Sequence, residues 1–307
     1  MSTKQPRVIF AGTGSFAVPM LRALQPQTTI VAVVSQTTIS PIGTIATQRG
    51  LRVLTPTHID TIAQEFNDCH PDLLIVADYG QIIPDSILSL PRYGCLNIHP
   101  SLLPRYRGAS PIPAAILNGD TATGVTIIVM DTAMDHGPIL AQTPHPLTGQ
   151  ETAESLEASL AAAGAELLLR ILPHYLRGEI KKVEQNHAQA TYCQILRRSD
   201  GELAWEDSPE NVSRKIRAYY PWPGVWCRVT LRGKPKVIKL LNVQPWTEAC
   251  GLVPSLKAGL FFWQHSLLGL RLTSGALAVA ELQAEGGRKL SGEAFYRGYH
   301  DIVHDTP

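Results

Sequence analysis

Short apolar runs with the length of β-strands alternate with helix-length segments through the first half of the chain. The runs Val8–Ala11, Ile30–Val34, Leu73–Ala77 and Leu96–Ile98 are each followed by a turn and then by a segment of helical length. This alternation is typical of parallel βαβ units, in which the connecting helices cover both faces of a sheet. The pattern predicts an α/β fold built on a doubly wound, mostly parallel sheet.

Helical segments fit between and after these runs. Phe16–Leu24, Ile59–Phe66 and Pro111–Leu117 have the required length, and the long alanine- and leucine-rich segment Ala153–Leu176 has strongly helical composition. This last segment is expected to close a first domain. We therefore place the first domain at residues 1–185.

From about Asp200 the sequence pattern changes to short β-rich runs separated by Gly, Pro and polar turns. The runs are Val225–Leu231, Val237–Val243, Gly259–Trp263 and Ala276–Leu282. Regularly spaced short strands with turn signals favour a small antiparallel barrel. A second domain is thus expected at residues 200–307.

Composition narrows the class of protein. The 307 residues suit two domains, and 44% apolar with 17% charged residues is typical of a folded globular protein. The net charge of +1 gives no global attraction for polyanions, and the five scattered cysteines suggest neither a disulfide framework nor a zinc site. The first strand follows the polar start at once, and no apolar stretch reaches membrane-spanning length, so a cytoplasmic location is expected.

A glycine turn follows the first predicted strand. Gly12 and Gly14, with Ala17, fit the Gly-x-Gly-x-x-Ala pattern of dinucleotide-binding turns. A nicotinamide enzyme would also place a carboxylate at the end of the second strand, which here ends Val34-Ser35-Gln36. The glycines are explained equally well by a tight turn from strand to helix.

The segment from Cys95 to Gly108 carries the strongest chemical signal. Alternation along a strand places Asn97 and His99 on one face, at the carboxyl end where α/β sheets bind ligands. The loop Ser101–Pro104 that follows contains residues that continue neither a strand nor a helix. A lone histidine in a strand is usually structural, but the paired asparagine favours a binding or catalytic site.

Two carboxylates follow the apolar run that starts at Gly124. Asp131 comes as the run ends and is well placed to cap a turn, whereas Asp135 is better placed to reach the neighbouring strand. The sequence therefore favours Asp135 as the third member of a site with Asn97 and His99.

In their order along the chain, Asn97, His99, the Ser101–Pro104 loop and Asp135 resemble the signature of the formyltetrahydrofolate-dependent transformylases. Further segments are similar to the members of that family that act on methionyl-tRNA, and they cover nearly the whole chain. They include Phe10–Thr13, Ala77–Pro84, Gly108–Ile112, Thr191-Tyr192, Tyr220–Gly224 and Ser291–Phe295. The resemblance implies a Rossmann-like formyltransferase domain followed by an OB-like barrel that contacts tRNA.

The implied reaction moves the formyl group of 10-formyltetrahydrofolate to the amino group of initiator methionyl-tRNA. Attack of an amine on a formyl carbon creates an oxyanion and an ammonium, which Asn97, His99 and Asp135 are expected to stabilise and deprotonate. The resemblance assigns folate binding to Tyr79, Gly80, Ile82 and to Ser101, Leu102, Leu103 and Pro104. Core packing is an equal alternative for the two leucines. The folate supplies its own reactivity, so no metal is expected, and neither DNA nor a membrane is an expected partner.

The sequence departs from the family after the second strand. Members that act on tRNA usually carry a longer basic loop there, whereas Ser35–Gly43 passes on directly, as if about ten residues were missing. In the family that loop helps to hold the tRNA acceptor end. Without that loop, the candidates for contacts with tRNA phosphates are basic residues elsewhere in the chain. They are Arg105, Arg107, Arg197, Arg198, Lys234, Lys236 and Lys239.

Other functions remain open at this stage. A formyltransferase for an amino sugar nucleotide shares the same catalytic residues and often a second domain. A folate-binding module would bind without transfer, and a folate hydrolase would release free formate. An enzyme for glycinamide ribonucleotide fits less well, because it would normally end near the first domain.

Overall fold

The computed structural model describes residues 5–250 and 252–305, and the chain forms two compact units. The first unit holds the residues up to Ala115 together with Asp120–Thr148 and Ser155–Ile195. The second holds Ile116–Gly119, Gly149–Glu154 and the chain from Leu196 onward. Two short segments from the first half of the sequence thus belong to the second unit.

A seven-stranded sheet forms the centre of the first unit, with the order β3-β2-β1-β4-β5-β7-β8. Its strands are β1 (Arg7–Gly12), β2 (Thr29–Val34), β3 (Val53–Leu54), β4 (Leu73–Ala77), β5 (Cys95–His99), β7 (Ala122–Val129) and β8 (Ile139–Pro146). The first five in spatial order are parallel, whereas β7 runs antiparallel to β5 and β8 antiparallel to β7. The strand order reverses between β1 and β4, the switch point at which α/β sheets bind ligands.

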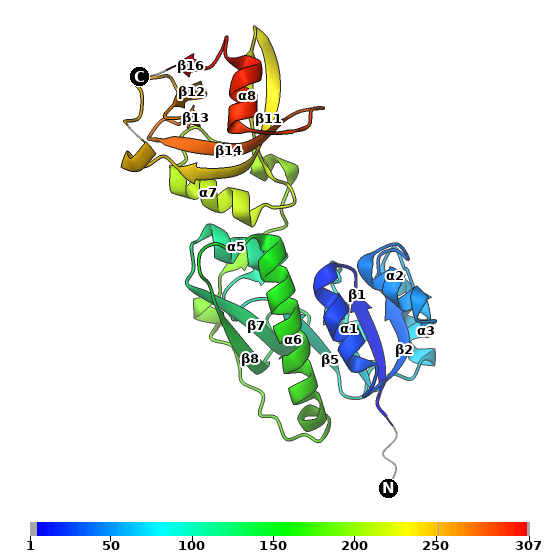
Figure 1. Ribbon diagram of the computed structural model, residues 1–307. Coiled ribbons are helices and arrows are strands. Elements are labelled where there is room, and N and C mark those ends of the chain that lie inside the picture. The colour runs from blue at the N-terminus through cyan, green and yellow to red at the C-terminus, as the bar shows by residue number, and fades with distance from the viewer. Residues whose placement is uncertain (1–4, 251, 306–307) are drawn as a thin grey trace. The chain divides into compact units, whose positions relative to one another are not determined.

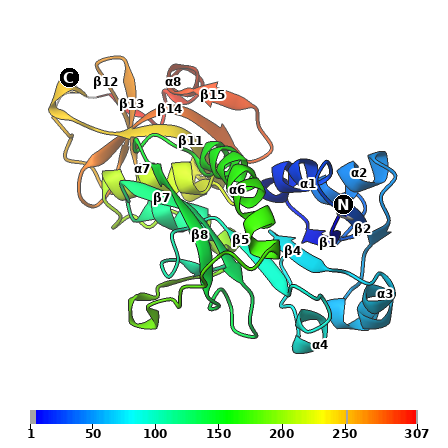
Figure 2. The ribbon, with the colours of Figure 1, turned by 90° about the horizontal axis from the view of Figure 1, so that it is seen from below.

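Helices cover both faces of this sheet. They are α1 (Val18–Leu24), α2 (Pro41–Gln48), α3 (Ala63–Asp68), α4 (Asp85–Leu88), α5 (Pro111–Leu117) and α6 (Ala153–Leu176), with 3₁₀ turns η1 (Ser15–Ala17), η2 (Ile59–Ile62) and η3 (His187–Gln189). Figure 2 shows α1 and α3 on opposite sides of β1. On one face, Ile9 and Leu74 pack with Phe66 of α3 and Ile87 of α4.

The long helix α6 covers the other face, alongside β5 and β7 (Figure 1). Gly164 lets the helix approach closely, because a Cβ at this position would lie 3.2 Å from Ile98 Cγ2 of β5 and 3.4 Å from Val125 Cγ1 of β7. The same Cβ would lie 2.6 Å from Met20 Cε of α1, so α1 and α6 share this face. The doubly wound, mostly parallel sheet predicted from the sequence is confirmed.

A second, very short sheet joins distant parts of the first unit. Arg107–Gly108 (β6) pairs in parallel with Tyr192–Cys193 (β9). The pairing brings the segment after β5 next to the chain that follows α6. Nothing in the sequence pattern predicts this pair, because each strand has two residues.

The second unit is built on a sheet with the order β10-β11-β14-β13-β12-β16, and β15 pairs with β14. Its pairs are antiparallel except for β12 and β16, which run parallel. Its strands are β10 (Val225–Leu231), β11 (Lys234–Pro245), β12 (Phe261–Gln264), β13 (Leu267–Arg271), β14 (Ala276–Ala284), β15 (Lys289–Ser291) and β16 (His304–Asp305). Two helices, α7 (Pro209–Ala218) and α8 (Gly292–Tyr299), and the turns η4 (Arg198–Gly201) and η5 (Glu248–Cys250) complete it.

The predicted antiparallel architecture is confirmed in this unit, and its closure into a barrel stays a prediction. The four predicted strands are present, while β13, β15, β16 and both helices were not predicted. Within the described part of the chain, none of the helices has the length and apolarity needed to cross a bilayer.

Candidate active site

Three polar side chains gather on the face of β5. Asn97 Nδ2 donates to Asp135 Oδ1 at 3.0 Å, and His99 Nδ1 lies 3.6 Å from Asp135 Oδ2. Asn97 and His99 share this face because successive strand residues point to opposite sides. The main-chain nitrogen of Gly108 donates to Asp135 Oδ2 at 2.8 Å. The structure thus brings together the three residues that the sequence singled out.

His99 is buried and held from two sides. Its Nε2 lies 2.8 Å from the main-chain oxygen of Tyr106, and the residue is 4% exposed. A carbonyl oxygen only accepts, so Nε2 carries a hydrogen. The other nitrogen, Nδ1, faces the Asp135 carboxylate. At 3.6 Å this contact is longer than a hydrogen bond, so the ring is fixed through Nε2 while Nδ1 is left facing the carboxylate.

The loop between β7 and β8 separates the roles of its two carboxylates. Asp131 bonds locally: its Oδ1 accepts from Ala133 N at 3.0 Å, and its Oδ2 lies 2.7 Å from His136 Nδ1. Asp135 instead adopts a left-handed conformation, with φ of 50°, that directs its carboxylate toward β5. Such a conformation is uncommon for a residue other than glycine and needs support from its surroundings.

The loop after β5 is anchored by β7 and β8. Thr126 Oγ1 donates to the main-chain oxygen of Ser101 at 2.6 Å and accepts from Leu103 N at 3.1 Å, while Gln142 Nε2 donates to Leu103 O at 2.9 Å. Ser101 and Leu103 are buried, at 0% and 3% exposure. Leu102 and Pro104 remain partly exposed. Of the two leucines, Leu103 therefore has the position of a core residue.

The segment after β4 is tied to the turn after β1. Tyr79 O accepts hydrogen bonds from Thr13 Oγ1 at 3.3 Å and from Gln36 Nε2 at 3.2 Å. The ring of Tyr79 is buried, and its hydroxyl has no hydrogen-bond partner among the described residues. Burial raises the pKa of Tyr79 to about 12. Ile82, by contrast, is 73% exposed and presents an apolar surface beside Gly80, whose φ is 80°.

Asp78 lies at the switch point and was not singled out from the sequence. Its main-chain oxygen accepts from Thr13 N at 2.9 Å, and its carboxylate occupies the place where a Cβ on Gly14 would point, 1.8 Å from Oδ2. Removal from water, and then the charge of Glu157, raises the pKa of Asp78 from 3.8 to about 6. Only its position directly after a buried strand could have indicated this carboxylate.

The short connection after β2 is a compact turn. Ser35 Oγ and Ser40 Oγ lie 2.8 Å apart, and Ser40 Oγ accepts from Gly43 N at 2.9 Å to cap α2. Thr37 Oγ1 accepts from Ser40 N at 3.1 Å. The chain therefore passes from β2 to α2 through a hydrogen-bonded turn in place of a long basic loop.

The two arginines beside the site are engaged within the first unit. Arg105 Nη2 donates to both carboxylate oxygens of Asp120 at 2.9 Å, and Arg107 is 2% exposed. The basic residues predicted in the second unit have more surface: Arg197, Arg198, Lys234 and Lys236 are exposed, and Lys239 is partly so.

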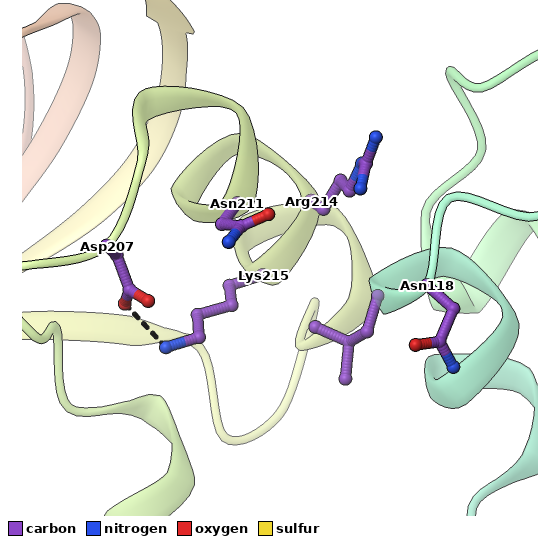
Figure 3. Close-up of a pocket in the computed structure, with 6 residues that line it drawn as sticks. Asn118, Asp207, Asn211, Arg214 and Lys215 are labelled. Carbon is purple, nitrogen blue, oxygen red and sulfur yellow. Dashed lines mark hydrogen bonds and ion pairs between the residues drawn. The ribbon is translucent and has the colours of Figure 1, made fainter. Parts of the chain in front are cut away.

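The second unit also carries a polar pocket of about 390 Å³ that the sequence did not indicate. It is lined by Leu117, Asn118, Asp207, Asn211, Arg214 and Lys215. Figure 3 shows Arg214 and Lys215 extending from α7, with Lys215 Nζ paired to Asp207 Oδ2 at 2.6 Å. Since this carboxylate offsets the charge of Lys215, Arg214 is the cation that an anionic group would meet here.

Comparison with known families agrees with this architecture. Residues 6–172 match the model of the formyl transferase family, and residues 195–300 match the model of the formyl transferase C-terminal domain. This chain belongs to the formyl transferase family. A methionyl-tRNA formyltransferase of Myxococcus xanthus is 37% identical over 96% of each chain. One from Chloroflexus aurantiacus is 38% identical over 96% of this chain and 97% of the relative.

Solved structures share the fold at lower identity. HypX from Aquifex aeolicus in complex with tetrahydrofolic acid superimposes with a TM-score of 0.64 at 19% identity, over 99% of this chain. The chain spans about half of HypX, 49% of its length. An N-formyltransferase from Helicobacter canadensis, in complex with folinic acid and dTDP-3-aminofucose, gives a TM-score of 0.65 at 16% identity and covers 92% of this chain and 99% of that one.

Proposed function

We propose that this protein transfers the formyl group of 10-formyltetrahydrofolate to the amino group of initiator methionyl-tRNA. The observation that carries the proposal is the cluster of Asn97 and His99 of β5 with Asp135 of the β7–β8 loop, in a chain that is similar over 96% of its length to methionyl-tRNA formyltransferases. The product is N-formylmethionyl-tRNA, the substrate for the start of translation.

The side chains supply what the reaction needs. The amine attacks the formyl carbon and forms a tetrahedral intermediate with an oxyanion and an ammonium nitrogen. Asn97 Nδ2 carries two hydrogens: one is donated to Asp135, and the other can be donated to the oxyanion. The 3.6 Å between His99 Nδ1 and Asp135 Oδ2 exceeds a normal hydrogen bond, so a protonated His99 has this N–H available as a further donor to the oxyanion. Asp135 supports the imidazolium charge and accepts the amine proton, directly or through water. This proton is then passed to the folate nitrogen as its bond to the formyl carbon breaks, while the oxyanion collapses to the carbonyl of the new amide.

Folate is placed along the two loops beside this cluster. Ile82 offers an exposed apolar side chain to the flat pterin, and Leu102 keeps a partly exposed one. Tyr79, Ser101 and Leu103 are buried, so they act by fixing the main chain of their loops, while Gly80 and Pro104 shape those loops. Their anchors are Thr126 and Gln142 on one side and Thr13 and Gln36 on the other.

Residues 1–185 then form the catalytic, folate-binding domain, and residues 200–307 contact the tRNA. Support comes from the exposed lysines of β11, from Arg214, and from Trp222 and Tyr220, which are 56% and 42% exposed. Basic groups neutralise phosphates, and exposed aromatic rings stack on bases. These groups offer contacts that do not depend on a long loop after β2.

The test is formation of formyl-methionine on initiator tRNA by the purified protein with 10-formyltetrahydrofolate. We expect Asn97→Ala, His99→Ala and Asp135→Ala each to lower kcat by about 10²- to 10³-fold, the usual effect of losing a group that stabilises the transition state. Folate affinity should change little. Asp131→Asn is the matched control, because among the described residues this carboxylate bonds to Ala133 and His136 of its own loop.

Two results would contradict the proposal. Formylation of a dTDP-linked amino sugar, with none of methionyl-tRNA, would assign the site to an amino sugar nucleotide. Folate binding without transfer, or release of free formate, would indicate a binding module or a hydrolase. Turnover retained in any one of the three alanine variants would remove that residue from the scheme.

A further inference from the structure

The main chain around Asp135 is held by a residue far away in the sequence. Gln185 Nε2 donates to Asp135 O at 2.8 Å and to Gly137 O at 2.8 Å. One amide group thus bonds the main chain of Asp135, whose carboxylate faces His99, and the main chain two residues further on. Because Asp135 has a φ of 50°, which its own side chain disfavours, these two bonds help to hold it in the conformation that the site requires.

A buried arginine fixes the direction of that amide. Arg107 Nε and Nη2 donate to Gln185 Oε1 at 3.2 and 2.7 Å, and the two residues are 2% and 5% exposed. If the amide turned over, its NH₂ group would meet the guanidinium and its oxygen would meet two carbonyl oxygens. The hydrogen bonds from Arg107 therefore orient the Gln185 amide so that its N–H donors face the loop of residues 130–138 between β7 and β8, here called the Asp135 loop.

The same guanidinium reaches the other side of the loop. Arg107 Nη2 lies 2.9 Å from His187 Nδ1, and the His187 ring stacks on His136 with centroids 4.1 Å apart and planes at 3°. His136 directly follows Asp135. Arg107 also directly precedes Gly108, whose nitrogen donates to Asp135 Oδ2. Arg107 is thus linked to the Asp135 loop by a side-chain route on each side and by its own main chain.

The surroundings of the Arg107 guanidinium indicate why position 185 is a glutamine and not a glutamate. The acceptors around Arg107 are an amide oxygen, an imidazole nitrogen and the Tyr192 hydroxyl at 3.5 Å, and none of the carboxylates in the described ranges pairs with it. A glutamate at position 185 would give the buried cation a counter-ion. It would lack the two N–H donors to the loop. A glutamine is what a role in holding carbonyl oxygens requires.

We propose that Arg107 and Gln185 are positioning residues for formyl transfer: they act through Asp135, by fixing its main chain so that its carboxylate stays on Asn97 and His99. This inference rests on the proposed function for its kinetic readout. The geometric part concerns the Asp135 loop alone and is measurable without turnover.

Gln185→Glu is the sharpest test, because it keeps the size and the acceptor for Arg107 while removing both donors. We expect kcat to fall by about 10- to 100-fold, as displacement of a reacting group by about 1 Å does. KM for 10-formyltetrahydrofolate and the thermal midpoint should stay near the wild-type values. The control is Gln283→Glu in the second unit, which loses a bond of the same type, from Nε2 to Gly287 O at 2.8 Å.

A spectroscopic readout separates this inference from the proposed function. With ¹⁵N-labelled histidine, the ring signals of His99 should shift in Gln185→Glu in the same direction as in Asp135→Asn, whether or not the protein formylates any substrate. Unchanged His99 signals together with kcat within twofold of wild type would overturn the proposal. If Gln185→Glu does not fold, Arg107→Lys undergoes the same comparison, since lysine keeps the charge but lacks the planar pair of donors; unperturbed His99 signals there would overturn it equally.

Discussion

Replacing Asp78 by asparagine should stabilise the protein at neutral pH and leave its stability at about pH 4 almost unchanged. In the folded chain the pKa of Asp78 is raised from 3.8 to about 6, first by removal from water and then by the charge of Glu157. Between these two values the folded state holds a proton that the unfolded state has lost. The free energy of unfolding therefore falls as pH rises from about 4 to about 6, and the loss persists above that range.

The size of the effect follows from the shift and from exposure. A rise from 3.8 to about 6 corresponds to at most about 3 kcal/mol, at about 1.4 kcal/mol per pH unit. The Asp78 carboxylate packs against Gly14, but the residue as a whole is exposed, so solvent screening reduces the effect and we expect about 1 kcal/mol. Asparagine keeps the shape beside Gly14 and removes the charge. Glu157→Gln should give a smaller gain, because it removes only the second cause.

The assay is urea unfolding at about pH 4 and at about pH 7.5. All five tryptophans lie after Leu196, so their fluorescence follows the second unit, whereas circular dichroism also follows the helices of the first. The variant should move the dichroism transition at the higher pH and leave the tryptophan transition in place. An equal shift at both pH values, or destabilisation at pH 7.5, would show that the Asp78 carboxylate is not held in an unfavourable place.

Two further substitutions have expected outcomes. Gly164→Ala should lower the free energy of unfolding by about 1 kcal/mol, because crowding against Met20 and Ile98 exceeds the gain in helix propensity, which is about 1 kcal/mol; a more stable variant in urea unfolding would contradict this packing. Joint replacement of Lys234 and Lys236 by alanine should weaken binding of methionyl-tRNA and flatten its dependence on salt by about one counter-ion per lysine. An unchanged slope in a salt titration would place the tRNA contacts elsewhere.

Much of this architecture follows from local patterns. The period of two places Asn97 and His99 on one face of β5, and the composition of Ala153–Leu176 predicts α6 with the bounds that the structure shows. The strands β4 and β10 also have their predicted bounds. These features depend on residues that are close together in the sequence, so the local pattern is enough to predict them.

Other features depend on partners that the sequence keeps far apart. Arg107 and Gln185 are separated by 78 positions, and nothing in the residues around either one indicates that they meet. The β6–β9 pair that brings their segments together has two residues per strand, too short for any periodicity. The raised pKa of Asp78 likewise arises from burial and from the charge of Glu157, which lies on α6, far from Asp78 in the sequence.

The direction of β7 explains why the Asp135 loop needs such support. Because β7 is antiparallel to β5, its last residue, Val129, pairs with Leu96, near the amino end of β5 and away from His99. His99 lies three residues further on, about 10 Å along a strand. The loop must therefore run back over the face of β5 before it returns to β7 at Gly137 and Pro138. There Val129 N donates a hydrogen bond to Pro138 O at 3.0 Å.

Beyond Met130, whose N donates to Cys95 O at 2.8 Å, the described part of this loop has no ladder of sheet hydrogen bonds, so its geometry depends on what it contacts. At Asp135 the hydrogen bonds come from the Asn97 amide, the Gly108 nitrogen and the Gln185 amide, which lie on three separate segments of the chain. Removing any one of them leaves the carboxylate attached but less well directed. Loss of rate with little loss of folding is therefore the expected signature of damage at all three positions, and it distinguishes this loop from the core strands beneath it.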